Sequence, residues 1–246
     1  MIIGNSVFRI EKCKSSFDLA KNKIEELEDG TVFVTDFIEN ARGRGGREWV
    51  CYTGQLLLTI LLKPQSLDSS EKLNQLIMIF SVAIIRILKK YNVGIKWPND
   101  FVIGGKKLGG ILGEVVWRNN KPQAFIVGIG INVNNVFCKS DKLYDIATSL
   151  KQEFGKQIDK DFLLNNILNE MDKLYFSFLK DSTFDIFGEW EQYQFYQGKN
   201  VKIHGYDGKI VNGVIEQFFA NGDILLANED GNKNRFSFYE ILEIVI

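Results

Sequence analysis

The C-terminal part of the chain is divided by four turn-forming dipeptides, and this feature limits the fold more than any other. Asp207-Gly208, Asn212-Gly213, Asn221-Gly222 and Asp230-Gly231 fall within 25 residues and alternate with short strand-like pieces. Such dipeptides favour the two-residue turns of β-hairpins, and closely spaced hairpins are typical of small antiparallel barrels. We therefore expect residues 197–246 to form a small SH3-like β-barrel domain, with strands at 201–204, 209–214, 215–219, 223–227 and 235–239.

Residues 1–196 combine helical and strand-like patterns. Apolar residues at helical spacing predict helices at 16–27, 73–91, 159–179 and 184–193, the second preceded by a capping box at Asp68 and Glu71. Runs rich in β-branched and aromatic residues predict strands at 31–37, 55–62, 94–97, 101–103, 107–117 and 123–133. We expect an α+β catalytic domain in which helices flank a mixed or antiparallel sheet, with a domain boundary near Gln197.

The composition excludes several classes of protein. Lys and Arg total 30 against 31 Asp and Glu, so a net charge of −1 gives no overall attraction to nucleic acid or to an anionic membrane. The three cysteines are far apart and form no CxxC pair, which supports neither a disulfide framework nor a zinc site. No apolar segment is long enough to cross a bilayer. We expect a cytoplasmic protein that binds neither nucleic acid nor membrane.

The segment Arg42–Trp49, called the arginine loop below, contains three arginines and three glycines. Guanidinium groups form paired hydrogen bonds with carboxylates and phosphates, and glycine lets a ligand approach the backbone closely. A solvated flexible loop or an RNA-binding patch would have a similar composition, so the loop alone does not decide between these alternatives. Trp49 favours a loop that folds over a ligand.

Two lysine-containing segments follow. In Lys96–Asp100, the lysine suits a phosphate and the aspartate suits Mg²⁺, although an ordinary turn would look the same. In Lys106–Glu114, lysines precede small residues, and a lysine there could neutralise the charge that develops when a carboxylate attacks a phosphate. A β-turn followed by an edge strand is the alternative for this second segment.

The glycine-rich segment Gly128–Val133 does not indicate a nucleotide-binding fold of the common kinds. It has Val133 where a dinucleotide fingerprint needs its third glycine, and no helix is predicted after it. A P-loop is excluded because no glycine lies five residues before the glycine of any Gly-Lys pair.

Taken in order, the four segments resemble the biotin–protein ligases (biotin–acetyl-CoA-carboxylase ligases). That family has a Gly-Arg-Gly-Arg loop ending in Trp, then Lys-Trp-Pro-Asn-Asp, Lys-Leu-Ala/Gly-Gly-Ile and Gly-x-Gly-x-Asn. Here the matching residues are Ala41–Trp49, Lys96–Asp100, Lys107–Ile111 and Gly128–Asn132. The resemblance spans residues 9 to about 240, and it predicts a short form without an N-terminal DNA-binding domain.

The resemblance implies a two-step reaction that uses ATP and Mg²⁺. Biotin is activated to biotinyl-5'-AMP and then transferred to a lysine of a biotin carboxyl carrier protein. The implied catalytic residues are Lys107, Arg44, Lys96 and Asp100, the last also as the Mg²⁺ ligand. The residues implied to bind biotin are Ser15, Ser16, Phe17, Glu39, Arg42, Gly43, Arg44, Gly45, Lys107, Gly109 and Gly110. Those implied to bind ATP are Arg42, Arg44, Trp49, Lys96, Asn99 and Asn132. Whether the chain forms a homodimer is left open.

Three residues depart from the family pattern. Phe17 stands where the family has Asn, Ile38 where it usually has Gln, and Ala41 where it prefers Gly. All three adjoin the implied biotin pocket, so a lipoate or other acyl-protein ligase and a catalytically weakened paralogue stay as alternatives. The lipoate branch lacks the Lys-Trp-Pro-Asn-Asp pentapeptide, which favours biotin.

Overall fold

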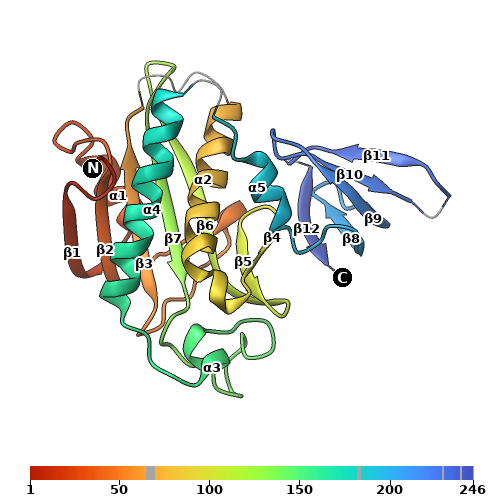
Figure 1. Ribbon diagram of the computed structural model, residues 1–246, viewed down its shortest axis with the longest axis horizontal. Coiled ribbons are helices and arrows are strands. Elements are labelled where there is room, and N and C mark those ends of the chain that lie inside the picture. Colours follow the sequence, from red (N-terminus) through yellow and green to blue (C-terminus); the bar gives the residue numbers. More distant parts are fainter. Residues whose placement is uncertain (65–69, 182–183, 229, 239, 246) are drawn as a thin grey trace.

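The chain folds around a seven-stranded sheet and a smaller five-stranded sheet (Figure 1). The computed structural model describes residues 1–246 except 65–69, 182–183, 229, 239 and 246. In the large sheet the strands are β1 (Val7–Cys13), β2 (Thr31–Ile38), β3 (Leu56–Leu62), β4 (Gly94–Lys96), β5 (Asp100–Ile103), β6 (Lys106–Arg118) and β7 (Lys121–Ile131).

The large sheet is mixed, as the sequence predicts. Its order is β1-β2-β3-β7-β6-β5-β4. Among the neighbouring strands of this sheet in the described residues, only β1 and β2 pair in parallel, and the other neighbours are antiparallel. The strand β1 is not among the predicted ones, because its residues are mostly exposed and show no alternation of buried and exposed positions.

The helices are α1 (Ser16–Asn22), α2 (Ser70–Leu88), α3 (Leu150–Phe154), α4 (Lys160–Lys180) and α5 (Phe187–Gln192). The predicted helix at 16–27 is shorter than expected, since α1 ends at Asn22, although Ile24 and Leu27 are still buried. The helix α3 is not among the predicted ones. The predicted capping box at Asp68 lies outside the described residues.

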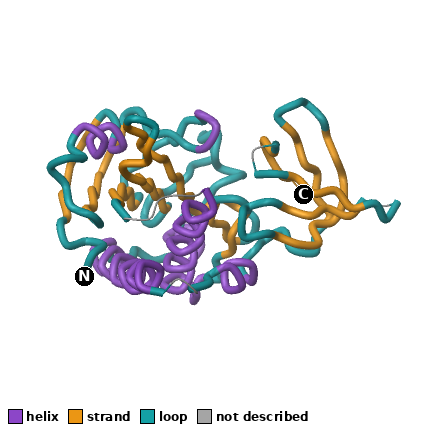
Figure 2. Tube along the Cα trace, turned by 90° about the horizontal axis from the view of Figure 1, so that it is seen from above, coloured by secondary structure: helices purple, strands orange, loops and turns teal. Residues whose placement is uncertain are grey.

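The two faces of the large sheet have different covers, because successive side chains of a strand point to opposite faces. Leu58 and Ile60 of β3 belong to the main core with α2 and α4, while Leu61 packs in a second cluster with Ala20 of α1. The long helices run along one side of the strands in the view from above (Figure 2). The functional site lies on the α1 face.

The C-terminal sheet is antiparallel, with the order β11-β10-β9-β8-β12. Its strands are β8 (Asn200–Gly205), β9 (Ile210–Phe218), β10 (Ile224–Ala227), β11 (Lys233–Phe236) and β12 (Ile241–Val245). The predicted hairpin at Asn212-Gly213 is wrong. These residues lie inside β9, where a Cβ on Gly213 would be 2.4 Å from the carbonyl oxygen of Ala227, so glycine allows β10 to approach closely.

Hydrogen bonds connect residues on the two sides of the predicted boundary. The Trp97 indole donates to the carbonyl of Gly222 at 3.1 Å, and Tyr196 Oη donates to the carbonyl of Ile244 at 2.7 Å. The division at residues 196 and 197 itself stays a prediction. Within the described residues, no helix is both long and apolar enough to cross a membrane.

Candidate active site

A cavity of about 320 Å³ lies on the α1 face of the large sheet, beneath the arginine loop. Its floor is formed by alternate residues of three neighbouring strands: Leu57 and Thr59 of β3, Gly110, Leu112 and Glu114 of β6, and Gly128 and Gly130 of β7. Its other walls come from the start of α1 and from the arginine loop.

The arginine loop is a compact turn. Gly43 N–H donates to the carbonyl of Arg47 at 2.7 Å, and Trp49 N–H donates to that of Ala41 at 2.9 Å, so the two ends of the loop are paired. Gly45 and Gly46 have φ angles of 68° and 75°, which other residues rarely adopt. Glycine at these positions therefore closes the turn that covers the cavity.

An ion pair lies at one end of the floor. Lys107 Nζ is 2.7 Å from Asp100 Oδ1 and 5.3 Å from the centre of the Trp49 ring. The antiparallel pairing of β5 with β6 places Asp100 opposite Gly110, where a Cβ would be 3.0 Å from Asp100 Oδ1. Glycine at 110 therefore lets the carboxylate lie against the strand, and the Lys107 ammonium group lies between this carboxylate and the Trp49 ring.

Two glycines of β7 each leave space for an aromatic ring. A Cβ on Gly128 would be 2.4 Å from Phe17 Cε2, and a Cβ on Gly130 would be 2.6 Å from Trp49 Cζ2. Both glycines point to the cavity face, since residues two apart share a face of a strand. The Gly-x-Gly pattern thus lets Phe17 of α1 lie against β7 at Gly128 and Trp49 of the arginine loop lie against it at Gly130.

Hydroxyl groups line the α1 end of the cavity. Ser15 caps α1 by accepting a hydrogen bond from Asp18 N–H at 3.2 Å, as expected for a serine at a helix start. Thr59 Oγ1 donates to Ser16 Oγ at 2.7 Å, and both side chains are buried. The beginning of α1 is therefore fixed to β3 at this end.

Arg44 lines the cavity wall, but its guanidinium group turns to the C-terminal sheet. Its Nη2 donates to the carbonyls of Phe238 at 2.7 Å and Ile241 at 3.0 Å, and the group lies 4.1 Å from the centre of the Phe238 ring. Burial lowers the pKa of Arg44 from its usual value. This contact between the loop and the C-terminal sheet was not predicted.

The structure brings most of the predicted site residues to the cavity wall: Ser15, Ser16, Phe17, Arg42, Gly43, Arg44, Trp49, Asn99, Asp100, Lys107 and Gly110. Asn99 is also tied to the floor, because its Nδ2 donates to the carbonyl of Ile111 at 2.7 Å. Arg42 lies 3.8 Å from Asp18 and is more than half exposed.

Five predicted residues lie outside the cavity lining: Glu39, Gly45, Lys96, Gly109 and Asn132. Glu39 pairs with Lys12 at 2.9 Å, and Lys96 Nζ lies 5.8 Å from the centre of the Tyr196 ring. Asn132 is buried, where it accepts a hydrogen bond from Gln55 at 2.8 Å.

The remaining two are glycines. A Cβ on Gly109 would be 2.5 Å from the carbonyl of Gly130, and one on Gly45 would be 3.1 Å from the Tyr206 hydroxyl. Gly109 therefore allows β6 and β7 to pack, and Gly45 faces the C-terminal sheet.

The strand positions Leu57, Thr59, Leu112 and Glu114 line the cavity, but the sequence analysis missed them. The signal that could have found them is the two-residue period of a strand: once Gly110 faces the ligand, Leu112 and Glu114 do so too. Glu114 is paired with Lys21 of α1 at 2.5 Å.

The acidic groups suit a metal ion only together with a ligand. No cluster of three or more His, Cys, Asp or Glu side chains that could hold a metal exists in the described residues. Mg²⁺ is often bound by one or two carboxylates together with substrate phosphates. Asp100 alone could serve in this way for a nucleotide-bound Mg²⁺.

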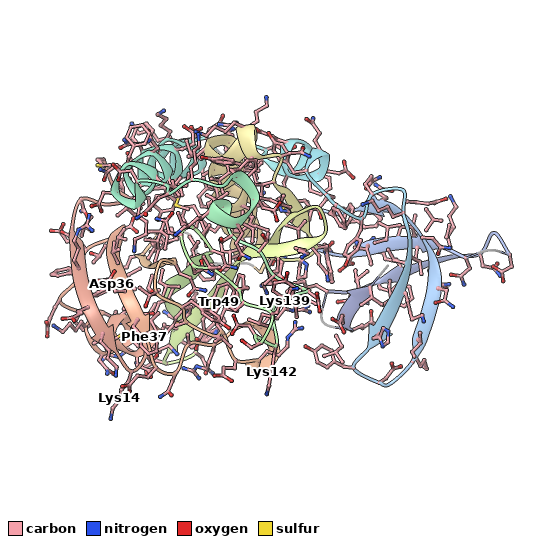
Figure 3. The ribbon with its side chains drawn as sticks, turned by 90° about the horizontal axis from the view of Figure 1, so that it is seen from below. Lys14, Asp36, Phe37, Trp49, Lys139 and Lys142 are labelled. Carbon is pink, nitrogen blue, oxygen red and sulfur yellow. The ribbon has the colours of Figure 1, made fainter. Side chains whose placement is uncertain are left out.

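Figure 3 views the molecule from below, with its side chains drawn. Trp49 lies toward the middle of the face seen from below, with Lys139 and Lys142, from the segment after β7, on one side and Lys14, which follows β1, on the other.

Known proteins share this arrangement over most of the chain. The family model of the Biotin/lipoate A/B protein ligase family matches residues 7–132. The bifunctional ligase/repressor BirA of Bacillus subtilis (strain 168) is 32% identical over 231 residues, which cover 91% of this chain and 69% of that protein. BirA of Escherichia coli (strain K12) is 26% identical over 93% of this chain and 71% of its own length.

A solved structure agrees with the fold of both sheets. The biotin protein ligase from Aquifex aeolicus in complex with biotin and ATP superposes with a TM-score of 0.83 at 26% identity, covering 98% of this chain and 99% of that one. The family match includes all four segments from which the resemblance was drawn: Ala41–Trp49, Lys96–Asp100, Lys107–Ile111 and Gly128–Asn132. The chain belongs to the Biotin/lipoate A/B protein ligase family.

Proposed function

We propose that this protein is a biotin–protein ligase that forms biotinyl-5'-AMP from biotin and ATP and transfers the biotinyl group to a lysine of a carrier protein. The observation that carries the proposal is the cavity in which Lys107, Trp49 and the arginine loop surround a glycine-rich floor. The relative solved with biotin and ATP in the same fold supports it.

In the first step, a biotin carboxylate oxygen attacks the α-phosphorus of ATP. A new P–O bond forms, the bond to the β-phosphate oxygen breaks, and pyrophosphate leaves with the electron pair. Two anions have to meet in this step, and Lys107 and Arg42 supply positive charge at the cavity wall. When ATP binds, Lys107 would exchange its partner Asp100 for the reacting oxygens, and Asp100 would be free to contact the nucleotide's Mg²⁺.

In the second step, the neutral ε-amine of the acceptor lysine attacks the carbonyl carbon of the mixed anhydride. The amide bond forms, the C–O bond to AMP breaks, and the amine loses a proton. The arginine loop would limit the access of water to the adenylate until the acceptor arrives. Arg44 and Trp49 would act here as parts of the cover, and Ser15, Ser16, Phe17 and Gly110 as walls of the biotin pocket.

The residues outside the cavity lining need different roles. Asn132 would support the strand that carries Lys107, because its Nδ2 is 3.4 Å from the Lys107 carbonyl. Lys96 would reach a phosphate only after moving away from the Tyr196 ring. Glu39, Gly45 and Gly109 would act on the shape of the site rather than by contact with biotin.

The acceptor that we propose is a biotin carboxyl carrier domain, as the resemblance implies. We also propose a cytoplasmic location and a division into domains 1–196 and 197–246. The proposal does not depend on whether the protein forms a homodimer.

Pyrophosphate release tests the first step. The purified protein is incubated with MgATP and either biotin or lipoate, and we expect biotin-dependent release. Mass spectrometry of a carrier domain, after incubation with the protein, biotin and MgATP, should show one added biotinyl group on its acceptor lysine. Turnover with lipoate but not with biotin would overturn the proposal in favour of a lipoate ligase.

A further inference from the structure

Phe17 belongs to two environments at once. Its ring packs against the cluster between α1 and the sheet that includes Ala20 and Ile126, and it also lines the cavity. Above Gly128 the ring occupies the space of a missing side chain, since a Cβ there would lie 2.4 Å from Cε2 and 2.9 Å from Cζ. A ring held from both sides is a fixed wall, and it cannot adapt to a ligand as a flexible side chain would.

The wall stands at the end of the cavity away from Lys107. Gly110 is opposite Gly130 in the β6–β7 ladder, and Leu112 is opposite Gly128. Lys107 lies near Gly110 and the Trp49 ring lies against Gly130, so these groups mark the reacting end. Phe17 and Leu112 mark the other end, where the part of the acid far from its carboxylate would lie.

The polar groups at the Phe17 end already have partners within the protein. Ser16 accepts a hydrogen bond from Thr59, Ser15 accepts one from Asp18 N–H, and Glu114 is paired with Lys21. Phe17, Leu57 and Leu112 contribute ring and aliphatic surface to the cavity. An apolar pocket selects its ligand by size and shape, with about 10- to 200-fold discrimination for one methylene group.

We propose that Phe17, seated over Gly128, determines which carboxylic acid the site accepts. The wall favours an acid with a compact ring system that stacks on Phe17 and a chain that reaches Lys107. The inference rests on the proposed function, in that the cavity binds an acid with its carboxylate at Lys107.

The KM values for the acid and for ATP distinguish a role of Phe17 in selecting the acid from a purely structural role. Pyrophosphate release is measured for the unmodified protein, Phe17→Ala and Phe17→Leu, with biotin, desthiobiotin and lipoate. We expect Phe17→Ala to raise the KM for biotin about ten-fold, to change the KM for ATP by less than about two-fold, and to narrow the preference for biotin over the other two acids. The KM of Phe17→Leu for biotin should lie between those of the unmodified protein and Phe17→Ala.

Ile10→Ala is the matched control. Ile10 packs against the same apolar cluster but does not line the cavity, so its loss weakens the packing around α1 without changing the pocket. We expect unchanged preference among the acids. Equal effects of Ile10→Ala and Phe17→Ala, or a parallel rise in the KM values for biotin and ATP, would overturn the role of Phe17.

A double-mutant cycle tests the contact between the Phe17 ring and Gly128. The Cβ of Gly128→Ala would push the Phe17 ring into the cavity, so the KM for biotin should rise in the unmodified background. In the Phe17→Ala background there is no ring to displace, and the same change should have little effect. Gly130→Ala, which displaces Trp49, should change the KM for biotin by the same factor in both backgrounds. Additive effects at Gly128 would contradict the inference.

The two proposals fail in different ways. If the unmodified protein releases no pyrophosphate with any of the three acids, the proposed function is wrong and the inference falls with it. If the unmodified protein is active and Phe17→Ala leaves the KM values and the preference among acids unchanged, only the inference is wrong.

Discussion

Lys107 is the residue on which the proposed chemistry depends most. Its ammonium group lies between the carboxylate of Asp100 and the ring of Trp49, and its own side chain is 39% exposed. A partly exposed ion pair of this kind contributes about 0–1 kcal/mol to stability. The group is therefore available to a substrate at little cost to the fold.

Lys107→Met separates catalysis from stability at this position. We expect the rate of biotin-dependent pyrophosphate release to fall about 100-fold or more, because one charge that stabilises the transition state is lost. The melting temperature should change by no more than about 2–4 °C, as a loss of up to 1 kcal/mol implies for a chain of this size.

Lys106→Met is the control. Lys106 is exposed and lies 5.7 Å from the centre of the Tyr144 ring, outside the cavity lining. Its loss should leave the rate almost unchanged. A rate for Lys107→Met close to that of the unmodified protein would refute the role that we assign to Lys107.

At this scale the sequence predicted several motif residues of the cavity but not the surfaces around them. Lys107, Asp100 and Trp49 stand in short motifs that are recognisable without coordinates, and all three line the cavity. The contact of Phe17 with Gly128 depends on how α1 crosses β7, and no local pattern reports that. Asn132 stands in such a motif as well, yet its side chain is turned inward to Gln55.

One arginine joins three helices at the level of secondary-structure elements. Arg86 of α2 contacts Glu170 of α4 at 2.8 Å and Glu189 of α5 at 2.5 Å. The hydrogen bond and charge of Arg86 hold the pKa of Glu189 below its usual value. For Glu170, burial raises the pKa, but its bonds to Arg86 and Lys173 outweigh burial and lower it overall.

Arg86→Met should therefore have a pH-dependent effect on stability. Both glutamates have a lower pKa in the folded state, so their contribution is fully present above the ordinary glutamate pKa of about 4.3 and is lost as the pH falls through the lowered values. We expect a loss of about 1 kcal/mol in the free energy of unfolding at pH 7, because the Arg86 side chain is 36% exposed and the charges are screened. The loss should shrink at pH 3.

Urea unfolding at the two pH values measures this difference. Arg9→Met is the control, since Arg9 and its partner Asp161 are 58% and 68% exposed, and it should show little change at either pH. A loss for Arg86→Met that is equal at pH 7 and pH 3 would mean that packing, and not charge, joins the helices.

A buried hydroxyl anchors α4 to the sheet. Tyr175 Oη lies 3.1 Å from both carboxylate oxygens of Asp29, which also accepts a hydrogen bond from Lys63 N–H at 2.8 Å. Tyr175→Phe removes a donor from a half-buried carboxylate, so we expect the free energy of unfolding to fall by about 1–3 kcal/mol. Tyr193→Phe, whose hydroxyl makes a longer contact of 3.4 Å with Glu189, should cost less in the same urea experiment. The reverse order would contradict this account.

Elements with a strong apolar pattern were predicted well, and those without one were not. The stripe at 73–91 corresponds to α2 and the spacing at 159–179 to α4, because both bury one face against the sheet. The edge strands β1 and β12 were missed, and Asn212-Gly213 was read as a turn. What decides these cases is pairing with a partner strand, which a local pattern does not contain.

At the scale of the whole molecule, the arginine loop and the C-terminal sheet form one unit. Arg44 donates to the carbonyls of two residues that lie 194 and 197 positions further along the chain. Contacts at such separations are invisible to motif analysis, so the sequence predicted the two folds but not the connection between them. The cover of the cavity is thus held from the C-terminal sheet.

Arg44→Lys tests the contact between the arginine loop and the C-terminal sheet, and the rates of amide hydrogen exchange measure its effect. A lysine keeps the charge but cannot present a guanidinium fork to two carbonyls or stack as well on Phe238. We expect the protected amides of Gly43 and Trp49 in the loop to exchange about ten-fold faster, as the loss of about 1.4 kcal/mol would cause. The amide of Tyr206, which donates to the carbonyl of Glu240 at 3.0 Å, should exchange faster too, because the contact is reciprocal.

Arg47→Lys is the matched control for a purely local change. Arg47 Nε donates to the carbonyl of Arg44, within the same loop, at 3.2 Å and in an exposed position. Its replacement should affect the loop amides slightly and leave Tyr206 unchanged. Faster exchange in the loop of Arg44→Lys, with Tyr206 unaffected, would show that the loop is independent of the C-terminal sheet. A joint response would mean that the C-terminal sheet stabilises the cover under which the adenylate forms.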